Sequence, residues 1–527
     1  SILAEGDNVN PGSVKIAVSG SELYVGGLGS DSYIAGKITV DGASAGAATL
    51  NISNDIGNVI IDSGSALDFS STSAAGAQLT ITTSSFGSTS LGGGLYDLSG
   101  TSGGQLKIDT GSFSSLDSSQ ESIFDLSGSS GAGGQIDIVA RSTDLSLGQN
   151  STYALNSSFD ARGGNGGALV TLVSPGVANI DLGAFNLSTN TGAGAQFKLT
   201  APLDINLDRT LKVNGGSNGS GGQIEIQSSN SYVNISGALE AKGGTSGGSG
   251  GKVTVSSNGN LAIVGGVNAA GTAGGGANIT LTSDSGAIDV GVGIDGGSGT
   301  GGSAVTLKAL NDITVNGVIR TSSLVSGGGG SINVSSTSAF GPVTFHAAGL
   351  AANAAGSGSG GQILVANSIT NVDIGASGIS ANSVSGNAGS VDIKLPGLIA
   401  VSGAVEAKSQ SGAGAGGSVF MQGSAVTSGA IDVSAGGSGS GGTINLSGAS
   451  GVTVNGSMKA NTQTKGGDII VQTNGALRVT GDVFAHGSSS SGGQITLNSL
   501  GTVPGSVYQI SGSVAADGAT GGKINLA

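Results

Sequence analysis

The sequence predicts an all-β protein folded as a parallel β-helix, or β-solenoid, with three short strands in each coil. A unit of about 28 residues recurs from Gln105 to Lys523, and such a period is typical of a solenoid or another stacked array. Apolar residues alternate with polar ones in period two and no segment has helical spacing, which excludes arrays of helix pairs. A propeller blade would need four antiparallel strands in about 40 residues. We therefore expect each strand to pair with its equivalent in the next coil of a right-handed β-helix.

One unit illustrates the pattern. After Gly221 and Gly222, a first strand places Ile224 and Ile226 on its inward face. A second strand follows with Val233 and Ile235, and a third with Leu239 and Ala241. A Gly/Ser-rich return over residues 243–249 closes the unit. Returns of this kind vary in length, so we expect them to bulge from one edge of the solenoid.

The copies of the unit align on the residue that follows a Gly-Gly, Gly-Ala or Ala-Gly pair. The aligned residues are Gln78, Gln105, Gln135, Ala168, Gln196, Gln223, Lys252, Ala277, Ser303, Ser331, Gln362, Ser390, Ser418, Thr443, Asp468, Gln494 and Lys523. Two looser copies begin at Ser13 and Ala48, which predicts about 19 coils in all.

Inward positions of the first strand form a predicted ladder of mostly β-branched residues, which pack well on a pleated surface. The ladder comprises Ile224/Ile226, Val253/Val255, Ile279/Leu281, Val305/Leu307, Ile332/Val334, Ile363/Val365, Val391/Ile393, Ile444/Leu446, Ile495/Leu497 and Ile524/Leu526. The third strand supplies a column of alanines, which predicts a narrow corner. This column comprises Ala241, Ala269, Ala352, Ala381, Ala407, Ala460, Ala485 and Ala516.

The glycine pairs occur in phase with the strands. We expect them to supply the positive φ angles of a corner, since other residues adopt such angles only at a steric cost.

Residues 1–160 are less regular than residues 161–527, although Tyr96-Asp97-Leu98-Ser99-Gly100 is echoed by Phe124-Asp125-Leu126-Ser127-Gly128. We expect one continuous solenoid over residues 1–527, with wider coils in the first 160 residues.

The composition limits the function classes. A net charge of −14 argues against nucleic acid or an anionic membrane surface as a partner. Charged residues make up only 9% of the chain, so we expect a surface rich in hydroxyl and amide groups. The chain has no Cys, which is compatible with export and excludes disulfides and thiolate chemistry. No apolar run approaches the roughly 20 residues of a membrane span. The start at Ser1 lacks a basic leader, so we interpret the chain as a mature or trimmed segment.

A glycosidase-like or lyase-like site would need acidic residues close together on one face of the predicted solenoid. Outward first-strand acids are Asp137, Glu225, Asp392 and Asp468. They lie several coils apart, which at about 4.8 Å per coil is too far for a catalytic carboxylate pair. We predict no catalytic residue and no enzymatic activity.

Other candidate groups have simpler explanations. His346 and His486 are far apart and lie in no zinc or triad motif, so we interpret them as surface or corner residues. Calcium-binding repeat motifs are absent. We interpret two oppositely charged pairs, Glu240/Lys242 and Glu406/Lys408, as solvated surface pairs. We interpret Phe420 and Phe484 as outward aromatic residues that could contact a sugar or a neighbouring molecule. We predict neither a metal site nor a cofactor.

A family resemblance follows from the repeat. Asn311-Asp312-Ile313-Thr314-Val315-Asn316-Gly317-Val318-Ile319, with Gly-Gly-Ser-Ile-Asn-Val at 329–334, resembles the repeat regions of filamentous haemagglutinin-like bacterial surface exoproteins. The resemblance covers nearly the whole chain and implies a bacterial protein exposed at the cell surface. Asn10-Pro11-Gly12 matches only a fragment of the motif that is expected in the secretion domain of that family.

The leading functional hypothesis is a non-enzymatic extracellular subunit that assembles head to tail into a surface or matrix filament. Solenoids usually cap their end strands to prevent stacking, but strand patterns here extend to Val14 and Ile16 near one end and to Ile524 and Leu526 at the other. We predict that these end coils meet in self-assembly. The first alternative is an adhesin that binds surface glycans or other matrix components, and the second is a polysaccharide-active β-helix enzyme.

Overall fold

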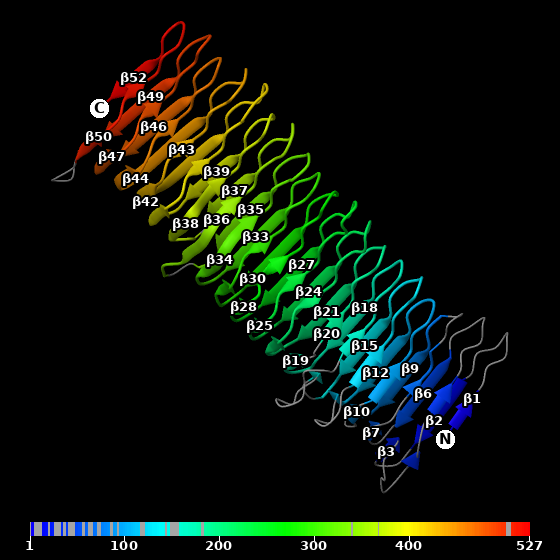
Figure 1. Cartoon of the computed structure of the whole chain (residues 1–527). Helices are drawn as coiled ribbons and strands as arrows, with labels where there is room; N and C mark the ends of the chain where they lie inside the picture. The colour runs from blue at the N-terminus through cyan, green and yellow to red at the C-terminus, as the bar shows by residue number, and fades with distance from the viewer. Residues whose placement is uncertain are drawn as a thin grey trace. The chain divides into compact units, whose positions relative to one another are not determined.

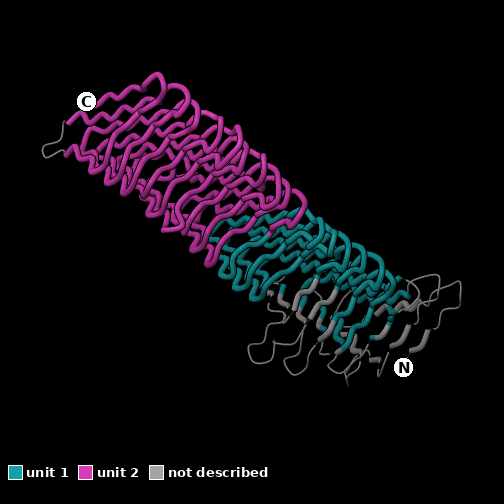
Figure 2. Tube along the Cα trace, turned by 45° about the horizontal axis from the view of Figure 1, so that its top comes forward, with its two compact units in different colours: residues 1–268 teal, residues 269–527 magenta. Residues whose placement is uncertain are grey.

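The computed structural model is all-β, with parallel strands stacked as a β-solenoid of about 15 coils (Figure 1). The structure describes residues 2–4, 13–18, 22–25, 33–34, 38–40, 48–54, 58–61, 67–70, 75–84, 88–91, 94–115, 122–142, 145–147, 158–180, 184–338, 341–366, 368–501 and 507–527. These residues include strands and no helix. Two compact units divide the chain into residues 1–268 and 269–527 (Figure 2). The predicted fold class is confirmed.

Unit 1 contains three ladders of parallel strands, one for each strand of the coil. The first ladder comprises β2 (Ser13–Val18), β6 (Thr49–Asn54), β9 (Gln78–Thr83), β12 (Gln105–Thr110), β15 (Gln135–Ala140), β18 (Leu169–Val173), β21 (Gln196–Ala201), β24 (Gln223–Ser228) and β27 (Lys252–Ser257). The second comprises β3 (Glu22–Val25), β7 (Asn58–Ile61), β10 (Ser88–Leu91), β13 (Ser112–Ser115), β16 (Leu145–Leu147), β19 (Ala178–Ile180), β22 (Ile205–Leu207), β25 (Val233–Ile235) and β28 (Leu261–Ile263), with β4 (Tyr33–Ile34) paired to β3. The third comprises β1 (Ile2–Ala4), β5 (Ile38–Val40), β8 (Leu67–Asp68), β11 (Gly94–Asp97), β14 (Ser122–Asp125), β17 (Ser158–Asp160), β20 (Ala184–Asn186), β23 (Leu211–Lys212), β26 (Leu239–Glu240) and β29 (Val267–Asn268).

Unit 2 contains the same three ladders, and some of its strands run through a corner. First strands are β30 (Asn278–Ser283), β33 (Ala304–Ala309), β35 (Ser331–Ser336), β37 (Gln362–Ala366), β39 (Ser390–Lys394), β46 (Asp468–Thr473), β49 (Gln494–Ser499) and β52 (Lys523–Leu526). First and second strands are continuous in β42 (Ser418–Ser428) and β44 (Thr443–Val454). Separate second strands are β31 (Ile288–Val290), β40 (Leu398–Val401), β47 (Ala476–Val479) and β50 (Tyr508–Ile510). Second and third strands are continuous in β34 (Ile313–Arg320), β36 (Thr344–Ala351) and β38 (Asn371–Ser380). Separate third strands are β32 (Ile294–Asp295), β41 (Val405–Glu406), β43 (Ile431–Asp432), β45 (Met458–Lys459), β48 (Val483–Phe484) and β51 (Val514–Ala515).

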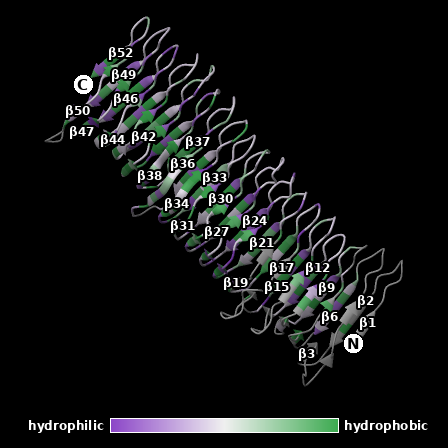
Figure 3. Ribbon diagram, in the orientation of Figure 1, coloured by the Kyte–Doolittle hydropathy of each residue, from purple (hydrophilic) through white to green (hydrophobic). Residues whose placement is uncertain are grey.

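The core is built from the inward residues of these ladders. Strand β24 alternates exposed and buried residues along its length, with Ile224 and Ile226 buried. Figure 3 shows hydrophobic residues concentrated on the strands, whereas the returns are pale or hydrophilic. The predicted first-strand rungs are buried except at Ile524 and Leu526. Period-two alternation therefore identified the core face.

Buried hydroxyl groups mark the corner after many first strands. The Ser228 hydroxyl donates to the Leu203 carbonyl oxygen at 2.6 Å, and the Ser257 hydroxyl donates to the Gly259 carbonyl oxygen at 2.7 Å. The chain turns here and leaves backbone groups without a strand partner. The inward Ser supplies that partner, which avoids the cost of a buried unsatisfied polar group.

The alanine column is confirmed, since all eight predicted alanines are buried. Earlier in the chain the same corner holds larger side chains, including Leu98, Leu126 and Leu187, which are also buried. The repeated Asp-x-Ser turn beside this corner is real: Asp97 Oδ1 accepts from Ser99 N at 3.0 Å, and Asp125 Oδ1 accepts from Ser127 N at 2.9 Å. The expectation of wider coils in residues 1–160 stays a prediction.

The predicted positive φ is found in the pairs only at Gly521, with a φ of 75°, and is wrong for the other described glycine pairs. Gly222 and Gly417 are not among the described glycines with positive φ. A Cβ on Gly222 would lie 2.0 Å from the Ala195 carbonyl oxygen, and one on Gly417 would lie 2.0 Å from the Gly389 carbonyl oxygen. Glycine is needed at these positions because the backbones of successive coils approach too closely for any side chain.

Four predicted first-strand positions are one residue early. Thr49, not Ala48, pairs with Ser13 and Gln78, and Leu169, not Ala168, pairs with Gln135 and Gln196. Asn278 and Ala304 likewise replace Ala277 and Ser303. Ile279 and Leu281 point into the core, and side chains alternate between the two faces of a strand. The apolar residues, rather than the pair of small residues before them, therefore determine where the first strand begins.

The predicted number of coils is slightly too high, at 19 rather than about 15. The compact units divide the chain after residue 268. The continuity of residues 1–527 and the less regular coils of residues 1–160 stay predictions.

We expect Ala407→Leu to lower the free energy of unfolding by about 1 to 3 kcal/mol, because it overpacks a full corner. A Cβ added to the adjacent Gly417 would already lie 3.0 Å from Ala407 Cβ. Chemical denaturation measures the change. The exposed Ala273→Leu variant is the control and should stay close to wild type; equal stability of all three proteins would contradict the inward assignment.

We expect Gly222→Ala to destabilise unit 1 by about 3 kcal/mol, since the added Cβ meets backbone atoms that cannot move independently. Gly247 provides the matched control in the following return, because a Cβ there meets nothing within 4 Å. The thermal unfolding midpoints of both variants test whether the backbones of successive coils are in close contact at Gly222. If Gly222→Ala were as stable as Gly247→Ala, the contact explanation would be wrong.

Candidate functional site

The outward acids of the first strands lie in separate coils, as expected. Asp137 is paired in register with Lys107 on one side and Thr171 on the other, and Glu225 Oε1 lies 3.0 Å from Lys198 Nζ. Asp392 lies between Leu364 and Phe420 in register, and Asp468 between Thr443 and Gln494. None of these in-register neighbours is a carboxylate, so the ladder does not pair any of the four acids for general acid and base chemistry.

Both histidines are partly exposed. His346 Nδ1 lies 3.1 Å from Asp373 Oδ2 on the second-strand ladder, and His486 Nδ1 lies 3.4 Å from Asp517 Oδ2 at the third-strand corner. The Phe484 ring lies 4.7 Å from the His486 ring, and Phe420 and Phe484 are half-buried. Over the described ranges, no three His, Cys, Asp or Glu residues gather as a metal site. The interpretation of the histidines as surface or corner residues is confirmed.

The Glu/Lys pairs of the third strand belong to a hydrogen-bonded corner. Glu406 Oε1 lies 2.7 Å from Lys408 Nζ, and Asn382 Nδ2 donates to Glu406 Oε2 at 2.8 Å. Asn382 Oδ1 accepts from the Lys408 backbone N–H at 2.9 Å. Asn214 holds Glu240 and Lys242 in the same way. The sequence signal for this asparagine is its place directly after the small corner residue.

These contacts change the titration of the two glutamates. Burial alone would raise the pKa of Glu406, but hydrogen bonds from Lys408 and Asn382 and the Lys408 charge lower it below the ordinary value of 4.5. The pKa of Glu240 is lowered through Asn214 and Lys242 against the same opposing effect of burial. Both side chains are ordered parts of a polar column, although their partial exposure limits their contribution to stability.

The predicted assembly residues lie on strands with a single described partner. Strand β52 pairs only with β49, and its Ile524 and Leu526 are 45% and 53% exposed, whereas their rung partners Ile495 and Leu497 are fully buried. Strand β2 pairs with β6, placing Val14 beside Leu50 and Ile16 beside Ile52. Ile16 is half-buried, and the Val14 side chain lies outside the described residues.

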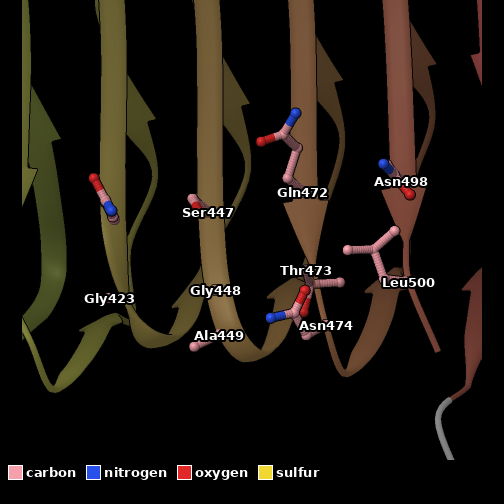
Figure 4. A pocket seen from close by; sticks show the side chains of 10 residues that line it. Gly423, Ser447, Gly448, Ala449, Gln472, Thr473, Asn474, Asn498 and Leu500 are labelled. Carbon is pink, nitrogen blue, oxygen red and sulfur yellow. The ribbon is translucent and has the colours of Figure 1, made fainter. Parts of the chain in front are cut away.

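Sequence reasoning missed a groove of about 340 Å³ in unit 2, at the corner between first and second strands. Figure 4 shows Gln472 and Asn498 on neighbouring strands, with Asn474 and Leu500 at the corners that follow. Gln422, Ser447, Gln472 and Asn498 are in register on β42, β44, β46 and β49. The available signal was the replacement of the inward corner Ser or Thr by Gly423 and Gly448.

Comparisons with known proteins return no matching family model, curated protein or solved structure. The resemblance to filamentous haemagglutinin-like exoproteins therefore stays a prediction. In the described part of the chain no helix is long and apolar enough to span a membrane.

We expect Lys408→Met to raise the pKa of Glu406, because burial then acts with one fewer stabilising partner. A carboxylate whose pKa is lowered by folding contributes stability above its unfolded pKa, and this contribution is lost as pH falls through the folded pKa. Side-chain carboxyl NMR titration measures the change. Lys465→Met, at an exposed lysine away from Glu406, is the control. A Glu406 pKa that is identical in all three proteins would contradict the assigned contacts.

Proposed function

We propose that this chain is a non-enzymatic structural protein whose β-solenoid assembles head to tail into an extracellular filament. The observation that carries the proposal is the contrast within one apolar ladder. Ile495 and Leu497 on β49 are fully buried, while Ile524 and Leu526 on β52 are about half exposed. A further coil laid on β52 would give these two side chains the same environment as every interior rung.

The backbone of β52 supports the same reading. Lys523 N donates to the Gly493 carbonyl oxygen, and Ala527 N donates to the Leu497 carbonyl oxygen, both at 3.0 Å. Because donors alternate between the two sides of a parallel strand, the N–H groups of Ile524 and Leu526 are directed away from β49. An added parallel strand would satisfy them, which is the usual route of edge-to-edge association.

The surface involved is larger than one strand. Strands β50 and β51 each have one described partner, β47 and β48 respectively. Tyr508 at the start of β50 is 42% exposed, and the preceding Val507 is 46% exposed. Covering the exposed half of an Ile or Leu stabilises association by about 1 kcal/mol. Association costs several kcal/mol in lost rigid-body freedom, so contacts beyond β52 must take part.

The proposed occupant of this edge is the first coil of a second copy. Strand β2 carries Ser13, Val14, Lys15 and Ile16 in the register of a first strand, with one described partner in β6. Joining unlike ends makes a heterologous contact, and a heterologous contact that does not close produces an open filament. The lack of Cys and the small charged fraction agree with an extracellular location.

We expect the purified chain to form filaments as its concentration rises, because each added copy covers one edge and presents another. The double variant Ile524→Asp, Leu526→Asp should abolish them, since it places two carboxylates in a contact that excludes water. Negative-stain electron microscopy and sedimentation velocity measure the assembly.

The control is Leu324→Asp, because Leu324 is 63% exposed but lies on a return of unit 2 rather than on β52. Filaments that persist in the β52 double variant would contradict this edge as the contact. A wild-type chain that stays monomeric at high concentration would contradict assembly altogether.

A further inference from the structure

The groove at the first corner of unit 2 is built by the backbone. In other coils the inward corner position holds a side chain, either a hydroxyl residue such as Ser228 or an apolar residue such as Ala201 or Leu395. Strands β42 and β44 have Gly423 and Gly448 there, and a register shift separates Gly423 from Ala425. A Cβ on Gly448 would lie 2.1 Å from the Gly451 carbonyl oxygen. The hollow is therefore present before any ligand binds, which reduces the entropic cost of binding.

The lining of the groove is polar and uncharged. Its ten residues include the amides of Gln422, Gln472, Asn474 and Asn498 and the hydroxyls of Ser447 and Thr473, with no Asp, Glu, Lys or Arg. Each amide offers both donors and an acceptor, and each hydroxyl offers both. Neutral groups of this kind bind other neutral polar groups, whereas phosphates and carboxylates are usually bound by Arg or Lys.

One acceptor in the groove is in an unfavourable state. Asn498 Oδ1 is shielded from solvent and has no hydrogen-bond partner in the described part of the chain. A buried acceptor without a partner is costly. A ligand hydroxyl recovers this cost when the Asn498 side chain turns its oxygen toward the groove. Leu500, which is 63% exposed beside it, provides an apolar wall.

The spacing of the polar groups indicates an extended ligand. Gln422, Ser447, Gln472 and Asn498 are consecutive partners in one ladder, so they recur at the strand spacing of about 4.8 Å. This spacing is close to the length of one hexopyranose unit in an extended chain. Successive sugar units can thus meet successive polar side chains, while the C–H face of the unit at β49 contacts Leu500.

We propose that this groove binds a neutral, linear glycan that runs across β42, β44, β46 and β49. Hydroxyl pairs on the sugar exchange hydrogen bonds with the amides, and one hydroxyl donates to Asn498 Oδ1. The proposal is independent of filament formation, because it uses the side of the coils and not the exposed edge of β52.

The experiment is isothermal titration of the 527-residue chain with cellohexaose, laminarihexaose, maltohexaose and chitohexaose, beside a hexamer of galacturonic acid and a hexapeptide of Gly and Ser. We expect saturable binding of at least one neutral hexasaccharide and none of the acidic sugar or the peptide. The double variant Gln472→Ala, Asn498→Ala should weaken this binding at least tenfold, because several hydrogen bonds are lost together.

Matched variants separate binding from folding. Gln227→Ala removes an exposed glutamine from the same ladder position of β24, where the corner is filled by Ser228, and should leave affinity unchanged. Ala449→Trp should block the groove and abolish binding while thermal unfolding stays as in wild type, since Ala449 is exposed. Absence of binding by every neutral hexasaccharide, preference for the acidic sugar or the peptide, or unchanged affinity in Gln472→Ala, Asn498→Ala would overturn the proposal.

Discussion

Close approach of the backbone at the glycine corner is the constraint on which the rest of the structure depends. A Cβ added to Gly222 would lie only 2.0 Å from the Ala195 carbonyl oxygen, and a Cβ added to Gly417 would be equally close to the Gly389 carbonyl oxygen. The Gly222 N–H also donates to the Val213 carbonyl oxygen at 2.8 Å. At Gly222 and Gly417 the corner therefore closes only without a side chain, whereas the equivalent position holds a small residue such as Ala195 in other coils. Closing the corner brings each first strand into register with the strand of the next coil.

Strict register converts every outward position into a column of side chains at a fixed spacing. One such column is the asparagine corner, where Asn382 joins Glu406 to the backbone of Lys408. Another is the row from Gln422 to Asn498, where no residue is charged and Asn498 Oδ1 lacks a described partner. The same scaffold produces a satisfied column in the first case and an unsatisfied one in the second. Differences in hydrogen-bond satisfaction, not in fold, distinguish a structural column from a candidate binding surface.

The features that depend on the alternation of apolar and polar residues could be predicted from the sequence alone. Ile224, Ile226 and Ala241 are buried as expected, because period two links each residue to one face of its strand. The role of Gly222 was not predictable, since a positive φ and a close contact select the same residue. The groove was not predictable either, because it requires Gly423 and Gly448 to lie beside Gln472 and Asn498, which only the register across coils reveals.

Assembly and glycan binding would use different surfaces of unit 2. An added coil would extend the first-strand ladder beyond β52, where the position equivalent to Asn498 is the small residue Ala527, whose N–H is already bonded to the Leu497 carbonyl oxygen. The amides of Gln422, Gln472 and Asn498 lie on preceding coils and face sideways from the ladder, so they would stay accessible in a stacked assembly. A filament built in this way would repeat the groove once per copy, and weak binding at each groove would then sum to high avidity for a long glycan.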